Sequence, residues 1–465
     1  MTFRYADYVS TIIGAVADLD TPGSNGMEPF QDRLEALYSR GIGSWGAGKT
    51  YPGAVRPFGM VQLSPDTYTG GDNTSGYSYH HDTIEGFSFT HLSGTGWYGD
   101  LGNLQVMPIV GGLAFHSGTN KHDLFQSDEE GWCSAYRHDS EIAEAGYYAV
   151  TLDRYRVRAE MTATERAGIL RFTFPASAES RIVIDLARRI GGRSVKQYIK
   201  VEGNGAVSGW IDCTPEGGGF GHGEGGVGYR LFFCGRFDTE WESFGLFDLG
   251  RDLGAQPEWE AEDLGFYAEF TTAEGQQIQF KAGISYVSLE GARRNLESEL
   301  NHWDFERVVR ESKAAWDEAL GVVHVEGEND KLKQIFYTAL YRAQLDPRNT
   351  ADADGQYRGP DRQVYRTSDY RFRTVFSGWD AFRSAMPLLS VIRPDVLNDI
   401  INTLIQIALT SGSTFPRWEL MGVETGCMVG DPGVVVVTDA YRKGIRNYDA
   451  AAAYEICKKT AFSET

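Results

Sequence analysis

The sequence is poor in cysteine, with five in 465 residues. None of them forms a C-x-x-C pair, which argues against a zinc knuckle or a dithiol redox motif. Their odd number and wide spacing also argue against a disulfide framework. The five are Cys133, Cys213, Cys234, Cys427 and Cys457.

Positive charge is also scarce. The chain has 44 Lys and Arg against 64 Asp and Glu, a formal net charge of −20, and no run rich in Lys or Arg. Such a surface repels polyanions and anionic membranes. We therefore expect no nucleic-acid partner and no membrane partner.

Long apolar runs are missing as well. No stretch approaches the roughly 18 apolar residues of a membrane helix. The first twenty residues lack a basic segment followed by a long apolar one, because the short run 11–16 is closed by Asp18. These absences predict a cytoplasmic protein without a signal peptide.

What is present before about residue 290 is a series of short strand patterns. Alternating apolar and polar residues occur over 147–161, 168–174, 181–186, 229–234 and 277–289. Turn signals such as Gly203-Asn204-Gly205 separate them. Many short strands with turns between them predict an antiparallel β-sandwich over residues 1–289.

After residue 290 the apolar period changes to that of helices. The charged stretch 290–320 predicts linker helices, and further helices are predicted over 332–343, 397–408, 433–443 and 448–460. Pro394 and Gly412 suit the start and the end of the second of these four, 397–408. Long loops rich in Trp, Asp, Arg and Glu join them, as in α/α toroids that carry their sites on loops.

The helix pattern predicts an unfinished domain. An (α/α)6 barrel consists of six helical hairpins, whereas only about five helices are predicted after Lys331. We therefore expect a helical linker over 290–325 and the first part of an incomplete (α/α)6 barrel over 326–465. The rest of the barrel is expected outside this chain or on a second chain.

Residues 43–50, GSWGAGKT, match the phosphate-loop pattern G-x-x-x-x-G-K-[ST]. That loop works only between a buried strand and a helix, where amide groups converge on phosphates. Here residues 32–40 have a helical pattern, and Tyr51-Pro52-Gly53 would break a following helix. We interpret the match as a glycine-rich surface loop without nucleotide binding.

Five unusual strings occur in order along the chain. They are YPGAVRPFGMVQLSPDT (51–67), GFSFTHLSGTGWYGD (86–100), FSGWDAFRSAMPL (376–388), FPRWELMGVETGCMVGD (415–431) and TDAYRKGI (438–445). Together they resemble the family 92 glycoside hydrolases. The resemblance implies a calcium-dependent, inverting exo-α-mannosidase acting on mannose-containing oligosaccharides such as N-glycans. It also implies a β-sandwich joined to an (α/α)6 barrel, with the active site between them.

The resemblance assigns the general acid to Glu424, in the string Val423-Glu424-Thr425-Gly426-Cys427-Met428. The family has Asn where this chain has Val423. An inverting glycosidase needs one carboxylic acid for the leaving oxygen and one base for water on the opposite face. A branch of the family that cleaves mannose-phosphate-mannose has Gln in place of the acid. Because this chain retains Glu, ordinary glycosidic linkages are expected.

Substrate binding is assigned to six further residues. Asp380 and Arg383, spaced i and i+3, can share a helix face and hold sugar hydroxyls by charge-assisted hydrogen bonds. An ion pair between the two is the alternative. Trp97 lies on a glycine-rich loop, where its ring could form a sugar-binding platform near the leaving group. The alternative is a ring that folds back onto the sandwich. The remaining candidates are His91, for which a core position is the alternative, Trp379 and Glu419.

No string here resembles the family's regions for the general base and most of its calcium ligands, which are expected beyond residue 465. The leading prediction is hydrolysis of terminal α-1,2-linked mannose, with calcium as cofactor. Three alternatives stay open: α-1,3 or α-1,4 linkages, a non-catalytic mannoside-binding fragment, and an unrelated α/α-toroid enzyme such as a disaccharide phosphorylase.

Overall fold

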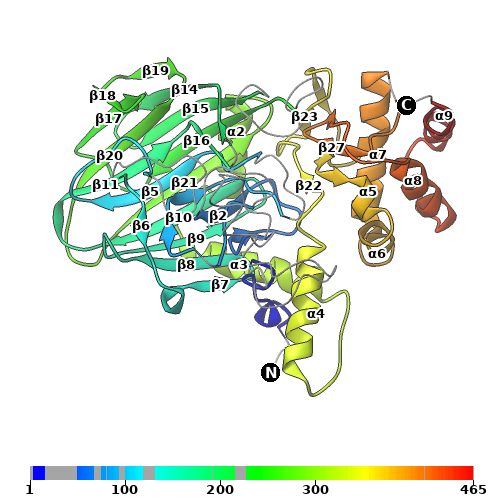
Figure 1. Cartoon of the computed structure of the whole chain (residues 1–465), viewed down its shortest axis with the longest axis horizontal. Coiled ribbons are helices and arrows are strands. Elements are labelled where there is room, and N and C mark those ends of the chain that lie inside the picture. The colour runs from blue at the N-terminus through cyan, green and yellow to red at the C-terminus, as the bar shows by residue number, and fades with distance from the viewer. Residues whose placement is uncertain are drawn as a thin grey trace, which may run out of the picture.

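Two large β-sheets form one part of the molecule and a group of helices forms the other (Figure 1). The computed structural model describes residues 4–15, 50–67, 75–79, 81–93, 100–118, 131–190, 192–214, 227–412 and 414–463. The phosphate-loop match falls outside these residues except for Thr50.

The first large sheet has eight strands, all paired antiparallel. In spatial order they are β1 (Ala54–Val55), β2 (Gln62–Asp66), β4 (Gly86–Ser88), β5 (Gln105–Val110), β11 (Ser177–Asp185), β20 (Leu264–Thr272), β17 (Ser243–Asp248) and β18 (Arg251–Gly254). Long-range pairs such as β5 with β11 bring together segments that are distant in the chain.

The second large sheet has nine strands, also paired antiparallel. In spatial order they are β19 (Glu258–Ala261), β14 (Lys196–Glu202), β15 (Ala206–Cys213), β16 (Tyr229–Phe237), β21 (Gln276–Ser285), β10 (Ala167–Phe174), β9 (Val157–Ala163), β8 (Tyr147–Leu152) and β7 (Ile142–Glu144). The predicted antiparallel sheets of the N-terminal region are therefore confirmed.

One apolar core lies between the two large sheets. Ile182 and Phe266 reach it from the eight-stranded sheet, and Phe172 and Phe280 reach it from the nine-stranded sheet. Successive strand residues point to opposite faces. The apolar residues of the alternating sequence pattern therefore form one row of side chains on each strand that points into the core. We call this shared core the sandwich core.

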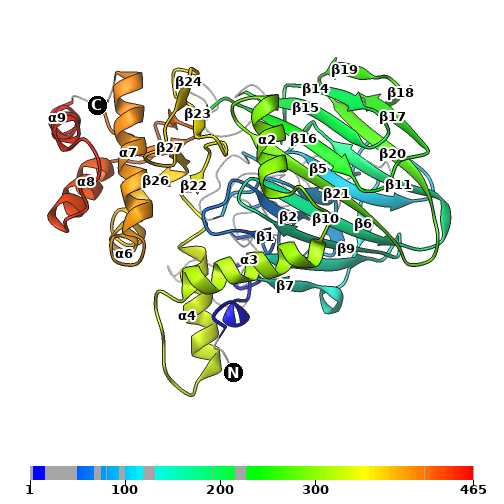
Figure 2. The same cartoon turned by 180° about the vertical axis from the view of Figure 1, so that it is seen from behind.

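Helices begin soon after the last long strand. Strand β21 ends at Ser285, and α2 (Leu289–Glu299) begins after Ser288, whose hydroxyl accepts a hydrogen bond from the amide of Gly291. Helix α2 contacts β21 and β16, so it covers part of the nine-stranded sheet (Figure 2). Helix α3 (Phe305–Leu320) follows, capped by the Asp304 carboxylate.

Helix α4 (Asp330–Arg342) lies where the apolar spacing predicts a helix over 332–343. Leu332, Ile335 and Phe336 belong to that spacing but are exposed. The helix buries Tyr337 and Tyr341 in a small cluster with α3 and the N-terminal turn η1 (Ala6–Tyr8). Amphipathic tyrosines therefore contribute much of the packed face.

The last part of the chain is mostly helical. It contains α5 (Gly378–Ala381), α6 (Ala385–Ile392), α7 (Pro394–Ser411), α8 (Pro432–Arg442) and α9 (Ala450–Ala461). Residues of α7 such as Leu397, Ile401 and Leu404 lie at the centre of a second apolar core, here called the helical core. Helices are confirmed here, whereas the (α/α)6 barrel stays a prediction. Among the described helices, none is long and apolar enough to cross a membrane.

Short strands connect the two parts. Three of them form a small sheet that we call the junction sheet: β26 (Phe376–Ser377), β27 (Trp418–Leu420) and β28 (Val423–Glu424). The other short elements are β22 (Arg348–Asn349) with β25 (Arg373–Thr374), β23 (Gln356–Arg358) with β24 (Val364–Arg366), β3 (Thr83–Ile84) with β6 (Ser134–Ala135), β12 (Arg188–Arg189) with β13 (Gly192–Arg193), and η2 (His138–Ser140).

The junction sheet belongs to both cores. Trp418 and Leu420 are part of the sandwich core, whereas Phe376 is part of the helical core. Phe376 pairs directly with Glu419, the residue between Trp418 and Leu420. Because neighbouring residues of a strand point to opposite faces, one face of this sheet meets the sandwich and the other meets the helices.

Candidate active site

A tight hairpin brings two predicted site residues together. Strands β27 and β28 are joined by Met421 and Gly422, with φ of 52° and 83°. Positive φ at both central positions is the mark of a type I′ turn, whose twist matches that of the strands. This turn places Glu419 directly opposite Glu424, and side chains of such a cross-strand pair lie on the same face.

Glu419 is buried, and only 1% of the residue's surface is exposed. One carboxylate oxygen accepts hydrogen bonds from the Thr374 hydroxyl at 2.7 Å and from the Gly422 amide at 2.5 Å. The other oxygen accepts from the Phe376 amide at 3.1 Å. Burial raises the pKa of this carboxyl to about 7, against the lowering effect of these bonds. Glu419 therefore ties β26 to the hairpin, which does not match its predicted contact with substrate.

Glu424 is more open than its cross-strand partner, because it is half-buried. One oxygen accepts from the Arg417 amide at 2.5 Å and the other from the Gly426 amide at 2.7 Å. These backbone groups fix the direction of the carboxylate without closing it off from solvent. Of the two glutamates, only Glu424 has the access that a proton donor to substrate requires.

Asp380 follows the junction sheet directly. It lies in the four-residue helix α5, and its carboxylate accepts a hydrogen bond from the hydroxyl of Ser377, the last residue of β26. Trp379 and Asp380 are both half-buried. The junction sheet and the short helix that follows its first strand therefore carry Glu424, Trp379 and Asp380.

Arg383 lies beyond the end of α5 and is exposed. Its guanidinium lies over the Trp379 ring, 5.3 Å from the ring centroid, and donates to the Trp379 carbonyl at 3.2 Å. Among the ion pairs between described residues, none joins Asp380 to Arg383. Helix α5 ends at Ala381, so Asp380 lies in the helix and Arg383 lies beyond its end, and the alternative of an ion pair between these two described residues is not observed.

His91 is fully buried in the sandwich part. Its Nδ1 lies 2.8 Å from the Gln62 carbonyl and its Nε2 lies 2.8 Å from Asp66. Both ring nitrogens are thus occupied by protein partners. No ring nitrogen is left for a sugar hydroxyl, and the structure therefore places His91 in the framework and not on a binding surface. Trp97 lies outside the described residues.

Two positioning residues had no sequence signal. Thr374 holds Glu419 and donates its hydroxyl to that carboxylate, while also accepting from the Met421 amide at 2.6 Å. Ser377 holds Asp380 in the same way. Hydroxyl residues are common along any chain, and only the folded junction sheet shows which carboxylates these two contact.

No calcium site can be assigned from the residues that are described. Among them, no group of three or more His, Cys, Asp or Glu side chains is arranged to hold a metal ion. The carboxylates of the junction sheet are instead occupied by hydroxyl and amide donors. We therefore derive no chemical step through calcium.

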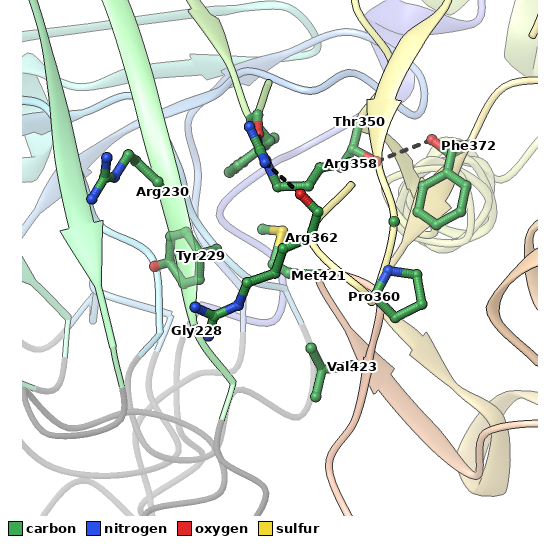
Figure 3. A pocket seen from close by; sticks show the side chains of 12 residues that line it. Gly228, Tyr229, Arg230, Thr350, Arg358, Pro360, Arg362, Phe372, Met421 and Val423 are labelled. Carbon is green, nitrogen blue, oxygen red and sulfur yellow. Dashed lines mark hydrogen bonds between the residues drawn. The ribbon is translucent and has the colours of Figure 1, made fainter. Parts of the chain in front are cut away.

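A cavity of about 250 Å³ lies against the sandwich side of the hairpin (Figure 3). Its walls come from β16, from the β23–β24 hairpin and from the turn and start of β28. Met421 and Val423 line it. Because Val423 and Glu424 are neighbours on one strand, their side chains point to opposite faces, and this cavity is distinct from the Glu424 face.

Comparison with known sequences identifies both parts of the chain. The model of the glycosyl hydrolase family 92 N-terminal domain matches residues 40–285, and that of the family 92 catalytic domain matches residues 291–465. An uncharacterized secreted glycosidase from Arthroderma benhamiae is 28% identical over 450 residues, which are 90% of this chain and 51% of that protein.

Solved structures agree. A family GH92 alpha-mannosidase from Bacteroides thetaiotaomicron is 30% identical, with a TM-score of 0.87 over 100% of this chain and 58% of its own. A family GH92 inverting mannosidase from the same organism is 24% identical, with a TM-score of 0.78 over 98% of this chain and 55% of its own. This second likeness concerns the fold. The chain spans little more than half the length of these relatives.

These findings correct two predictions. The cytoplasmic location is withdrawn, because the fungal relative is named as a secreted protein. The expectation that residues 326–465 are only an incomplete piece of a catalytic domain is also overturned, because the catalytic-domain model matches residues 291–465. With a family model matched in each half, the chain belongs to glycosyl hydrolase family 92.

Proposed function

We propose that the chain functions in an exo-α-mannosidase that hydrolyses terminal α-linked mannose from oligosaccharides such as N-glycans. The observation that carries the proposal is the half-buried Glu424 on the junction sheet of a family 92 chain. The proposal is supported by a second structure of the first Bacteroides thetaiotaomicron alpha-mannosidase named above, which is in complex with mannoimidazole. Inversion, calcium dependence and a preference for α-1,2 linkages enter as properties that the family resemblance implies.

In this proposal Glu424 is the general acid. It protonates the glycosidic oxygen as the bond to the anomeric carbon breaks, while a base activates water on the opposite face of the sugar. The Arg417 and Gly426 amides hold the carboxylate in one orientation before the substrate arrives. We assign no base to the described residues.

Asp380, Arg383 and Trp379 bind the terminal mannose in this proposal. The exposed guanidinium of Arg383, preset over the Trp379 ring, retains donors for hydroxyl groups. The Asp380 carboxylate accepts from Ser377 and has lone pairs left for further hydroxyls. Glu419 acts as a positioning residue, since it holds β26 and the hairpin together beneath these groups.

The decisive experiment is mannose release from α-1,2-mannobiose, measured with added calcium and again with a chelator. Release that Glu424→Gln abolishes supports the acid assignment, and loss in the chelator supports the calcium requirement. A folded preparation that binds the disaccharide but releases no mannose would contradict the hydrolase proposal and favour a binding role.

Linkage preference has its own test. Trp97 is proposed to line the leaving-group side, so Trp97→Ala should reduce activity on α-1,2-mannobiose more than on α-1,3- or α-1,4-linked substrates. Equal losses on all three would remove the basis for the α-1,2 assignment.

A further inference from the structure

Three arginines line the cavity on the sandwich side of the hairpin. They are Arg230 on β16, Arg358 at the end of β23 and Arg362 in the turn that follows (Figure 3). None of the twelve described residues that line this cavity is acidic. In a chain with a net charge of −20, three cations and no anion among the described lining residues are unexpected.

Arg358 is held in place by the backbone alone. Its guanidinium donates to the carbonyls of Tyr286 at 3.0 Å, Val287 at 2.6 Å and Arg362 at 2.8 Å. No ion pair between described residues involves Arg358. Carbonyl groups orient a guanidinium but do not neutralise it, so none of these three contacts compensates the charge of Arg358.

Arg362 is brought to the cavity by the turn between β23 and β24. Its φ of 63° is in the left-handed region, a conformation that a residue with a side chain adopts at a cost. The side chain is exposed, and no hydrogen bond or ion pair of that side chain is found among the described residues. The neighbouring Asp361 is turned to Tyr365 and to the Gln363 amide.

Of the three arginines, Arg230 alone has a carboxylate partner within the described part of the chain. It pairs with Asp212 at 2.6 Å and lies over the Trp210 ring at 4.2 Å. Asp212 lines an adjoining cavity of about 230 Å³ that the three arginines share. Among the described residues that line the two cavities, three cations against one anion leave a surplus of two positive charges.

The like charges affect one another. The pKa of Arg358 is lowered, first by burial and then by the charges of Arg230 and Arg362. An anion between these side chains would offset both the repulsion and the lost hydration. The cavity walls also include Met421, Val423 and Phe372, which exclude water and strengthen such an attraction.

We propose that the cavity lined by Arg230, Arg358 and Arg362 binds a tetrahedral oxyanion, phosphate or sulfate. Planar guanidinium groups match the paired oxygens of such anions and bind them by charge-assisted hydrogen bonds. With a volume of about 250 Å³, the cavity is smaller than the ~300–1,000 Å³ typical of drug-sized ligands. It suits a single oxyanion group, free in solution or carried as a substituent by a glycan.

Titration calorimetry at constant ionic strength tests this site without any requirement for turnover. Sulfate or phosphate is titrated into the whole chain, and each oxyanion replaces chloride so that the ionic strength stays constant. We expect saturable binding of either oxyanion by the unaltered chain. Heats that do not saturate, or that chloride reproduces, would overturn the proposal.

Arg362→Gln is the main variant, because the exposed Arg362 side chain makes no hydrogen bond or ion pair with the other described residues whose loss would disturb the fold. Its oxyanion affinity should fall by about tenfold or more, as expected for lost charge-assisted bonds. Arg358→Gln should lower it as well, with folding checked because three carbonyls lose their donor. The matched control is Arg366→Gln on the same hairpin, whose Nε donates to the Asp354 carbonyl away from the cavity.

The control should bind within about twofold of the unaltered chain. Equal losses in the control and in Arg362→Gln would indicate a general charge effect and would refute a site. Comparing inorganic phosphate with mannose 6-phosphate identifies the source of the anion. Tighter binding of the sugar phosphate assigns the cavity to a glycan-borne group, and equal binding assigns it to the free anion.

Discussion

Glu419 and Glu424 are direct partners across strands β27 and β28, yet the first is sealed inside the protein and the second is half-buried. The sealed carboxyl binds chain atoms only, from Thr374, Phe376 and Gly422. The open one is held by two backbone amides. The same face of one hairpin therefore carries a glutamate that positions the strands and a glutamate that is accessible for proton transfer.

The general-acid assignment predicts a large kinetic effect at Glu424. Glu424→Gln keeps the shape and the acceptor oxygen of the side chain but removes the transferable proton. We expect kcat on α-1,2-mannobiose to fall by about 10²–10⁴-fold, the range of general acid catalysis. Steady-state mannose release measures it, with thermal unfolding as the check on structure.

The matched control is Glu455→Gln on α9, where an exposed glutamate forms a surface ion pair with Lys458. Its kcat should stay within about twofold of the unaltered value. A Glu424→Gln variant with unaltered kcat would show that another group donates the proton.

Burial of Glu419 predicts a pH-dependent stability. Its pKa is raised by burial to about 7 in the folded chain, from 4.5. The folded state therefore binds the extra proton between these values, and stability falls as pH rises through this window. From about pH 6 to about pH 8, the free energy of unfolding should fall by about 1 kcal/mol through this group.

Urea unfolding of the chain and of Glu419→Gln at both pH values measures this effect. The variant cannot titrate at this position, so its pH dependence should be flatter by that amount. Identical pH dependences would show that Glu419 stays ionised inside the fold. Asp352, with its pKa raised by burial to about 6, contributes in the same direction and mainly at lower pH.

Arg383 predicts a binding defect. Removing its guanidinium in Arg383→Ala should raise KM for α-1,2-mannobiose by about tenfold or more, because charge-assisted bonds to the sugar are lost. The control is Arg446→Ala on the helical side. Arg446 also lies over an aromatic ring, that of Tyr441 at 4.2 Å, and donates to the Tyr441 carbonyl. If both variants changed KM equally, a role of Arg383 in substrate binding would be excluded.

Lys281 predicts a stability effect far from the site. Lys281 is buried, with 4% of its surface exposed. Its ammonium group donates to the carbonyls of Leu300 at 2.8 Å and His302 at 2.9 Å, just beyond the end of α2. Lys281→Met leaves both carbonyls without this donor and should lower the free energy of unfolding by about 1–3 kcal/mol.

Urea unfolding again gives the value. The control is Lys196→Met, at an exposed ion pair with Glu260, which should change stability by less than about 1 kcal/mol. A loss in the control as large as that in Lys281→Met would mean that the buried capping contact contributes nothing specific.

Much of the fold could be predicted from periodicity. The run 168–174 lies within β10 (Ala167–Phe174), and the helical pattern 397–408 lies within α7 (Pro394–Ser411). Both elements are long enough for several periods, and both have one face in an apolar core. Pattern and packing agree in such elements, which makes them visible in the sequence.

The junction sheet could not be predicted in this way. Its strands have two or three residues, too few for any period, and its turn begins with Met421 instead of the Asn or Asp that marks a type I′ hairpin. The environment of His91 was hidden too, because its partners Gln62 and Asp66 are 29 and 25 residues away. The site residues were predicted from the family resemblance, whereas their contacts are visible only in the folded structure.

The junction sheet contributes side chains to both the sandwich core and the helical core, and this has a consequence for protein engineering. Trp418 faces the sandwich core and Glu419, its neighbour, pairs with Phe376 of the helical core. A chimera that takes its sandwich from one family member and its helices from another must cut through contacts on one face of this sheet. The two halves of such an enzyme are therefore not interchangeable modules, and a working exchange would have to transplant residues 374–424 together with the inward-facing side chains on both sides.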